Sequence, residues 1–395
     1  MDGERKAPVY QRGGDCFFNA EGCELKIKWN AVGDGLVEAR AVSGGSFSEE
    51  IKAGNRIVLR HHRRNYPVIY IEDSKKLVLS DLWLCHGLGM GVIAQFSEDI
   101  TVNRVKVSPS AGSIFSMGAD ATHFVYCRGK IEVKGCFFEN QMDDAVNVHG
   151  IYQRVEKILS PTELVTKLVH HQQKGVRLGK AGERLSFSDS DTMLSYGDTV
   201  IEEIRILNKD YTYIRLKEAL SGVKEGDVAE NIEYVPDVRI ENCLFQNNRA
   251  RGVLLTTAGK VEVVGNTFAS AGAAILIEGD SKDWFESGAT KEIRIHHNVF
   301  KDCSYVPVWG AAPIQVSPSA RKTVERKYHG SMEITENTFY AFDDRLLKAK
   351  NMERLIFANN KIIKTNTFPK IDGERFLLQD INHWEEKENE FLPII

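Results

Sequence analysis

The chain has 395 residues, of which 42% are hydrophobic and 27% charged, and its formal net charge is −4. These values predict a well-packed protein and exclude a nucleic-acid binder held by phosphate neutralisation, which needs a basic surface. The short basic run at residues 60–64 is interpreted as a solvated edge. No apolar run reaches the roughly 18 residues that a membrane-spanning helix needs, so no membrane span is expected.

Two further features bear on location and metals. Residues 1–8 are polar and lack an apolar signal core, so either the protein is cytoplasmic or its export signal lies outside the chain. The seven cysteines form no Cys-x-x-Cys pair and have no histidine partner at zinc spacing, so no metal site and no cofactor are expected. Their odd number argues against a fully paired disulfide framework.

Residues 1–65 are predicted to form a small β module, which is barrel-like in pattern. Residues 37–42 alternate as a strand does, a Gly-Gly turn follows, and residues 54–60 form a second such segment. The first clear coil of the repeat described next begins only near Val68. Because the end of a β-helix needs a cap, we expect that N-terminal coils or a cap are missing from this chain.

From residue 66 onward the sequence repeats at the scale of a whole coil. Eight segments each begin and end with an apolar residue five positions apart, and they span residues 79–84, 102–107, 133–138, 240–245, 263–268, 295–300, 334–339 and 357–362. Their last residues step by 23, 31, 107, 23, 32, 39 and 23. A step of 23 fits one turn of a parallel β-helix, and longer steps are turns with enlarged loops. Leucine-rich repeats and propellers fit less well because their motifs are absent.

A column of small polar residues lies two positions before the closing apolar residue of the later segments. It holds Asn266, Asn298, Asn337 and Asn360, with Cys136 and Cys243 in the same column of earlier coils. Asparagines stacked at one bend can hydrogen-bond along the axis of the coil and satisfy the backbone there. We interpret the two cysteines as small buried thiols.

The step of 107 carries an insertion at residues 151–236. Within it, residues 199–207 and 211–216 alternate, with turn residues 208–210 between them, which predicts antiparallel strands of a small barrel. The predicted fold is therefore all-β: a right-handed parallel β-helix with inserted small antiparallel β-barrel modules. Its two β-helix parts are expected at residues 66–150 and 237–395.

The loops richest in candidate catalytic side chains lie between residues 107 and 145. Asp120 lies in one loop, and Asp143 and Asp144 lie in the next, just before a strand that includes Val146. Neighbouring coils are about 4.8 Å apart, so the three carboxyls are predicted to converge. Repulsion among them would keep one protonated as an acid while another stays ionised as a base, which is what glycoside hydrolysis requires.

A second acidic pair, Asp343 and Asp344, weakens any inference from an Asp-Asp pair alone. We interpret this pair as structural because Arg345, Lys348 and Lys350 follow it and are expected to be its charge partners.

The motifs around the candidate aspartates resemble glycoside hydrolase family 110, the exo-acting α-1,3-galactosidases. They are Gly-Ala-Asp-Ala-Thr-His-Phe at 118–124, Gln-Met-Asp-Asp-Ala-Val-Asn-Val-His-Gly at 141–150 and Asp-Trp-Phe-Glu-Ser-Gly at 283–288. The 23-residue spacing from Asp120 to Asp143 also matches, and the similarity extends from about Gly54 to Asn360.

This resemblance implies a β-helix with β-barrel modules and a metal-independent, inverting exo-glycosidase. It implies removal of terminal α-1,3-linked galactose, as in blood group B or linear α-galactosyl glycans, with Asp120, Asp143 and Asp144 as the catalytic residues. The partner is then a galactose-terminated oligosaccharide or glycoconjugate, and the location is secreted or periplasmic. A homo-oligomer, a required fucose branch and the division of acid from base are left open.

The side chains expected to bind the sugar are Asn147, His149, Trp284, Glu286, Arg251 and His123. Trp284 is a candidate platform for the apolar face of galactose. Arg251, like Arg249, either binds sugar hydroxyls or pairs with acidic side chains. Each of the other candidates could instead have a purely structural role.

Three other functions fit a β-helix. A polygalacturonase also uses clustered aspartates but needs basic residues for uronate carboxylates. A polysaccharide lyase needs a Lys or Arg base, often with calcium. A non-enzymatic sugar-binding β-helix would bind glycan without releasing galactose.

Overall fold

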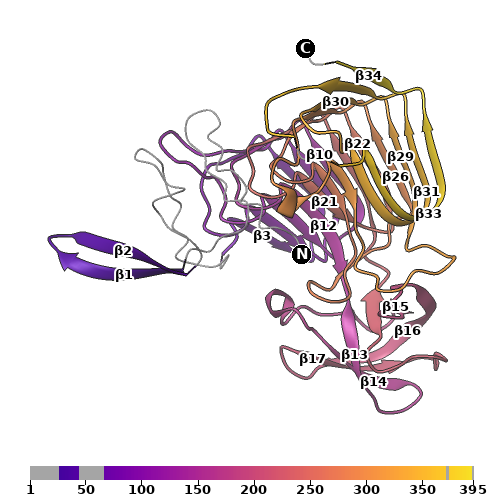
Figure 1. Cartoon of the computed structure of the whole chain (residues 1–395). Coiled ribbons are helices and arrows are strands. Elements are labelled where there is room, and N and C mark those ends of the chain that lie inside the picture. The colour runs from indigo at the N-terminus through magenta and orange to yellow at the C-terminus, as the bar shows by residue number, and fades with distance from the viewer. Residues whose placement is uncertain (1–25, 44–65, 371–372, 394–395) are drawn as a thin grey trace.

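The computed structural model describes residues 26–43, 66–370 and 373–393, which are almost entirely β-strand and loop (Figure 1). The helices in these ranges are two 3-10 turns, η1 (His171–Gln173) and η2 (Pro307–Trp309). Neither is long or apolar enough to cross a membrane.

At the N-terminal side, β1 (Lys26–Gly33) and β2 (Leu36–Ser43) form an antiparallel hairpin that projects away from the rest (Figure 1). The strand expected at residues 37–42 lies within β2. The Gly-Gly turn, the strand expected at residues 54–60, the basic run at 60–64 and the remainder of the predicted N-terminal module lie outside the described residues.

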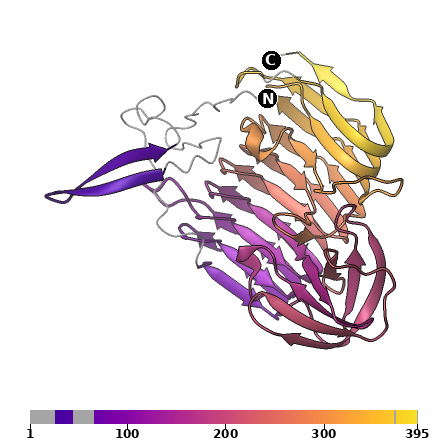
Figure 2. The same ribbon diagram turned by 60° about the horizontal axis from the view of Figure 1, so that its bottom comes forward.

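From Ile69 the chain winds into stacked coils, each with three faces, and the colour gradient of Figure 2 follows the stack from one end to the other. The first face contains β3 (Ile69–Glu72), β6 (Val92–Gln95), β9 (Thr122–Val125), β12 (Val146–Ile151), β21 (Val253–Thr256), β24 (Ile275–Ile277), β28 (Ile314–Val316) and the first halves of β31 (Leu347–Ala358) and β33 (Phe376–Lys387). The second face contains β4 (Lys75–Ser80), β7 (Glu98–Asn103), β10 (Arg128–Lys134), β19 (Pro236–Glu241), β22 (Lys260–Val264), β26 (Glu292–His296), β29 (His329–Thr335) and the second halves of β31 and β33.

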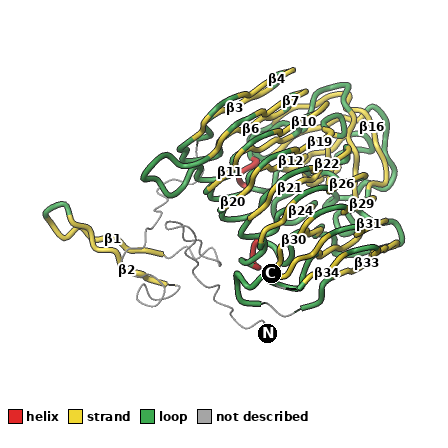
Figure 3. Tube along the Cα trace, turned by 90° about the horizontal axis from the view of Figure 1, so that it is seen from above, coloured by secondary structure: helices red, strands yellow, loops and turns green. Residues whose placement is uncertain are grey.

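The third face is a separate nine-stranded parallel sheet with one strand from each coil. Its strands are β5 (Trp83–Leu84), β8 (Lys106–Val107), β11 (Phe137–Glu139), β20 (Leu244–Gln246), β23 (Thr267–Ala269), β27 (Val299–Lys301), β30 (Thr338–Ala341), β32 (Lys361–Lys364) and β34 (Glu390–Leu392). Figure 3 shows the strands of successive coils lying side by side along the whole stack. The predicted parallel β-helix is confirmed.

The predicted repeat is also correct in register. The opening residues of the eight segments pair with one another from coil to coil on the second face, as Val263 does with Ile295. The closing residues pair on the third face, where Phe268 pairs with Phe300. These closing phenylalanines stack inside the coil, with ring centroids 5.3 Å apart for this pair and 4.7 Å apart for Phe245 and Phe268. The repeat exists because each coil buries its inner face only against its neighbours.

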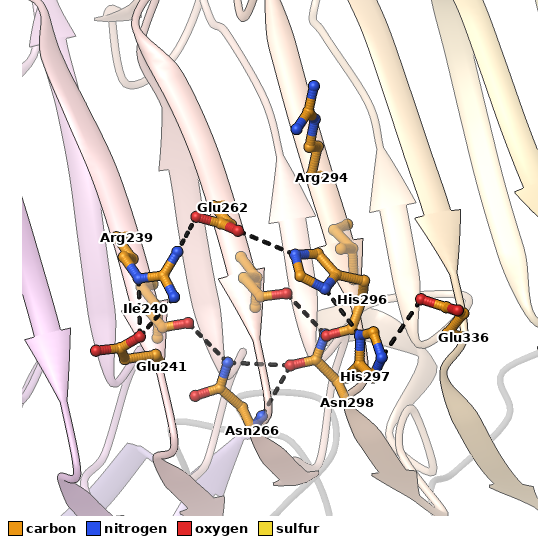
Figure 4. Close-up of polar contacts among 12 residues, drawn as sticks. Arg239, Ile240, Glu241, Glu262, Asn266, Arg294, His296, His297, Asn298 and Glu336 are labelled. Carbon is orange, nitrogen blue, oxygen red and sulfur yellow. Dashed lines mark hydrogen bonds and ion pairs between the residues drawn. The ribbon is translucent and has the colours of Figure 1, made fainter.

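The polar column forms the predicted hydrogen-bonded ladder, part of which Figure 4 shows. Asn298 Oδ1 accepts a hydrogen bond from the backbone N–H of Asn266 at 2.9 Å, and the backbone N–H of Asn298 donates to Asn337 Oδ1 at 2.9 Å. The ladder continues beyond Asn360 to Asn389, which the sequence interpretation missed. At its other end Cys136 and Cys243 are both buried, as expected.

Replacing Asn298 with Ala is expected to lower the free energy of unfolding by about 1–3 kcal/mol, because the buried N–H of Asn266 loses its acceptor. Urea unfolding would measure the change. The matched control is Asn382→Ala, since Asn382 is exposed and should cost no more than about 0.5 kcal/mol. Equal effects for the two variants would contradict a stabilising ladder.

The insertion contains a closed antiparallel barrel with the strand order β13-β14-β17-β16-β15-β18. Its strands are β13 (Gln153–Ile158), β14 (Glu163–Lys167), β15 (Arg184–Ser188), β16 (Ser195–Ile206), β17 (Tyr211–Leu216) and β18 (Val228–Asn231). The barrel lies beside the coil stack in Figure 1, because the chain leaves the first face after β12 and returns to the second face at β19.

Candidate active site

Two successive loops at the entry to the first face bring the candidate aspartates together. Asp120 and Asp144 each lie two residues before the strand residues Thr122 and Val146, which pair with each other. The backbone N–H of Ala121 donates to the carbonyl of Asp144 at 2.9 Å, so the loops run side by side. The register therefore stacks the two aspartates on neighbouring coils, as the sequence predicts.

The three carboxyls form one cluster. Asp120, Asp143 and Asp144 each offer an oxygen, and these oxygens lie within 4.8 Å of one another. All three residues are buried, with exposed fractions of 3%, 6% and 1%. Carboxyls that are buried and this close cannot all ionise freely, which is the condition for one to act as an acid while another acts as a base.

Arg251 binds the deepest of these carboxyls. Its backbone N–H donates to Asp144 Oδ1 at 3.0 Å, and its Nη2 donates to Asp144 Oδ2 at 2.8 Å. Of the two roles considered for Arg251, the structure therefore shows pairing with an acid. Burial raises the pKa of Asp144 to about 7: Arg251 opposes this shift, and the charges of Asp143 and Asp120 add to it.

Two histidines continue from the cluster along the first face. His123 Nδ1 lies 2.6 Å from Asp120 Oδ2, and His123 Nε2 lies 2.8 Å from His149 Nε2. His149 Nδ1 lies 2.6 Å from the backbone carbonyl oxygen of Gly150. Burial first, and the charge of His123 second, lower the pKa of His149 to about 3, so His149 is neutral at neutral pH.

A short strand places one more carboxyl beside His149. In β25 (Glu286–Ser287), Glu286 and Ser287 pair antiparallel with Ile151 and Gly150 of β12. Position 150 needs glycine here, since a Cβ would collide with Ser287. Glu286 Oε1 then lies 3.6 Å from His149 Nε2. Burial, with the charge of Glu278 second, raises the pKa of Glu286 well above its ordinary value.

Two neighbours of the cluster were missed by the sequence interpretation. Burial raises the pKa of Glu278 to about 7, with Arg251 opposing the shift and nearby acids adding to it. Glu278 lies three residues after Ile275, as His149 lies three residues after Val146, and these two strands are in register through Val253. The equivalent position of His149 in its own coil was therefore the signal that could have identified Glu278. Trp309 packs under Arg249 and Arg251, with ring centroid distances of 4.4 and 5.8 Å. It is the last residue of η2, in the long connection between β27 and β28, and no repeat marks it.

Several polar atoms around the cluster are buried and lack a hydrogen-bond partner among the described residues. They include Asn147 Oδ1, Thr256 Oγ1 and Arg251 Nε. Asn147 pairs with His123 across neighbouring strands, and Thr256 pairs with His149, so both belong to the strands that carry the histidines. Buried polar atoms without partners are costly, and a site that binds sugar hydroxyls supplies those partners on binding.

Trp284 differs from the other candidates. Its side chain is 44% exposed, and its ring packs against His170 of the insertion at a centroid distance of 4.4 Å. Its backbone carbonyl accepts a hydrogen bond from Gln173 Nε2 at 2.6 Å. The contacts of Trp284 thus join the segment before β25 to the insertion, and its ring packs on that insertion.

The second acidic pair is engaged elsewhere. Asp343 forms an ion pair with Arg345 at 2.7 Å, as expected. The partners of Asp344 are Lys364 and Lys370, at 2.9 and 2.6 Å. The prediction that Lys348 and Lys350 are partners was wrong, because lysines distant in sequence come close in the folded coil.

Three carboxylates within 4.8 Å also resemble the donor sets that hard divalent cations use. Here both oxygens of Asp144 already accept hydrogen bonds from Arg251, and Asp120 faces His123.

The fold and the cluster together describe a parallel β-helix with three buried carboxyls converging at the entry to its first face. Residues 163–229 match the family described as GLAA-B beta-barrel domain II. The chain is 35% identical to "Alpha-1,3-galactosidase A" of Shewanella woodyi over 82% of this chain and 54% of the relative. It is 35% identical to "Alpha-1,3-galactosidase B" of Bacteroides thetaiotaomicron (80% and 52%) and 34% identical to that of Akkermansia muciniphila (93% and 47%).

The resemblance to glycoside hydrolase family 110 is thereby confirmed: the chain is homologous to its α-1,3-galactosidases. It spans about half the length of these curated relatives. A solved structure described as a glycoside hydrolase aligns with 76% of this chain and 38% of its own, at 11% identity and a TM-score of 0.39, and a likeness this low supports no argument.

Proposed function

We propose that the chain carries the catalytic site of an inverting exo-glycosidase that removes terminal α-1,3-linked galactose from glycans of the blood group B or linear α-galactosyl type. Asp120, Asp143 and Asp144 are the proposed catalytic residues. The observation that carries the proposal is the convergence of these three buried carboxyls within 4.8 Å, one of them with its pKa raised to about 7.

The geometry of the cluster bears on stereochemistry. Inverting glycosidases commonly separate acid and base carboxyls by about 6.5–9.5 Å to leave room for water. The nearest oxygens here are closer than that. However, two hydrogen bonds of about 2.8 Å that meet at one tetrahedral water place their acceptors about 4.5 Å apart. Two of these carboxyls can therefore hold a single attacking water, and the third can protonate the leaving oxygen.

The sugar-binding residues proposed are Asn147, His149, Glu286, His123 and Arg251, with Trp284 as an outer platform. Asn147 Oδ1 and Arg251 Nε support this role because both are buried and neither has a hydrogen-bond partner in the part of the chain that the structure describes. The relatives named α-1,3-galactosidases support galactose as the sugar that is released. Substrates of this kind are displayed outside cells, so we also propose a secreted or periplasmic location.

A substrate panel separates this proposal from its alternatives. We expect release of galactose from an aryl α-galactoside and from a B-type trisaccharide, and no cleavage of polygalacturonate. Arg251 is already paired with Asp144, and Arg249 donates to the carbonyl of Met142 at 3.2 Å, so neither arginine is set aside for a uronate carboxylate. Cleavage of polygalacturonate alone, or binding of glycan without any release, would contradict the proposal.

Incubation with EDTA followed by assay on the trisaccharide should leave the rate unchanged within error. The expected reason is that Arg251 and His123 already occupy oxygens of two of the three carboxyls. A loss of activity that added calcium or another divalent ion restores would contradict a metal-independent reaction.

A further inference from the structure

The hydrogen bonds from Asp120 through His123 and His149 have a fixed direction. Their far end is the carbonyl oxygen of Gly150, which can only accept. The proton in that 2.6 Å contact must therefore belong to His149 Nδ1. His149 is neutral because burial lowers its pKa to about 3, so its other nitrogen, Nε2, carries a lone pair.

The next contact follows from this tautomer. His123 Nε2 lies 2.8 Å from the lone pair of His149 Nε2, so His123 must carry a proton on Nε2 and donate it. The remaining nitrogen, His123 Nδ1, lies 2.6 Å from Asp120 Oδ2. A neutral His123 protonated on Nε2 would turn a lone pair toward an ionised Asp120, which is repulsive at this distance. Hence one additional proton must lie between Asp120 and His123.

We propose that His149 fixes this direction and so holds His123 as an imidazolium against an ionised Asp120, which makes both histidines positioning residues for a catalytic base. The inference deepens the function proposed above and rests on it for the role of Asp120. The proton arrangement itself rests on the three contacts and on the neutral form of His149.

The surrounding charges favour the proton on His123 rather than on Asp120. The groups around this pair are carboxyls from two other segments, Asp143 with Asp144 and Glu286, together with Arg251. Behind them, Glu278 acts on Glu286. A cation on His123 is attracted by the ionised members of this set, whereas its neutral form is not.

The proposed step is hydrolysis of the glycosidic bond. Ionised Asp120 takes a proton from water while the water oxygen bonds to the anomeric carbon of galactose. The glycosidic C–O bond breaks, and another carboxyl of the cluster gives its proton to the leaving oxygen. His123 keeps its proton throughout, so its charge holds Asp120 ionised as the pH falls.

Two variants of His149 test the proposal. In His149→Phe the buried Nε2–H of His123 has no acceptor, so on acidification the proton goes to Asp120 instead. The acid limb of the pH profile of kcat/KM should then move to higher pH by about one unit or more. In His149→Gln the amide oxygen can still accept, and the acid limb should stay near that of the wild type.

The matched control is His329→Phe, which removes another buried imidazole, one that is hydrogen-bonded to Thr290 rather than to His123. Its acid limb should not move. If both His149 variants lose activity equally at every pH with the limb unmoved, the histidines have only a structural role and the proposal is overturned.

Nitrogen-15 NMR of the unmodified protein is a second measurement, and it does not depend on catalysis. We expect His123 doubly protonated and His149 protonated on Nδ1 alone at neutral pH, with assignments taken from the His123→Gln and His149→Gln spectra. A neutral His123, or His149 protonated on Nε2, would overturn the proposal. The expected spectrum in a protein that releases no galactose would instead refute the function and leave the proton arrangement standing.

Discussion

Replacing Asp143 with Asn is expected to lower turnover of a B-type trisaccharide by at least about a hundredfold, and the same loss is expected for Asp120→Asn and Asp144→Asn. The amide is nearly the same size as the carboxyl but neither accepts a proton as a base nor donates one as an acid. Because the three carboxyls lie within 4.8 Å of one another, the loss of any one also changes the ionisation of the other two. Initial rates at saturating substrate would measure the effect.

The control for these variants is Asp344→Asn, which changes the second acidic pair of the chain. Asp344 forms ion pairs with Lys364 and Lys370 and has no part in the cluster. Its turnover should remain within about twofold of the wild type, as is usual for surface groups outside the active site. Near-normal turnover in one of the three cluster variants would remove that aspartate from the mechanism.

Replacing Arg251 with Gln is expected to have the largest effect on stability, and the effect should grow with pH. Burial raises the pKa of Asp144 to about 7 from its ordinary 3.8. Below about pH 7 Asp144 is therefore mostly protonated in the folded protein, and the variant loses only the hydrogen bond that the guanidinium donates to an uncharged carboxyl. Above that pH the wild type holds an ionised pair, whereas the variant must either bury an unpaired charge or keep a proton that the unfolded chain releases.

The expected loss in free energy of unfolding for Arg251→Gln is about 3–5 kcal/mol near pH 8.5 and clearly smaller near pH 5.5, measured by urea unfolding at both values. Turnover should fall as well, since Asp144 loses the cation that opposes its protonation. Arg239→Gln is the control. Arg239 forms ion pairs with Glu241 and Glu262 near the protein surface (Figure 4), and its replacement should cost at most about 1 kcal/mol at either pH. A loss at Arg251 that does not depend on pH would contradict this account.

The sequence was sufficient to predict the coil because the requirement for burial repeats in each turn. Phe268 and Phe300 share a column because each buries the ring of the other. An asparagine such as Asn298 recurs from coil to coil because every bend leaves the same backbone groups in need of a hydrogen bond. The same register placed Asp120 beside Asp144, because both immediately precede strands that pair. Repetition thus fixed the positions of residues far apart in sequence.

The parts that escaped prediction are those that the repeat does not control. Trp309 ends η2 in a connection outside the repeat, so nothing in the sequence marked its packing against Arg249. The partners of Asp344 lie at the end of β32 and in the segment after it, and the nearest lysines in sequence were the wrong choice. Glu278 followed the column of His149, but it lies just past the end of β24, where the strand pattern stops.

The most direct test of the central claim is proton NMR of the sugar released from a B-type trisaccharide in the first minutes of reaction. A cluster that holds one attacking water between two carboxyls predicts β-galactose as the first product from the α-linkage, with the α-anomer appearing later by mutarotation. First release of α-galactose would contradict inversion at this site. No release of galactose from the folded protein would contradict the assignment of this acidic cluster as a glycosidase site.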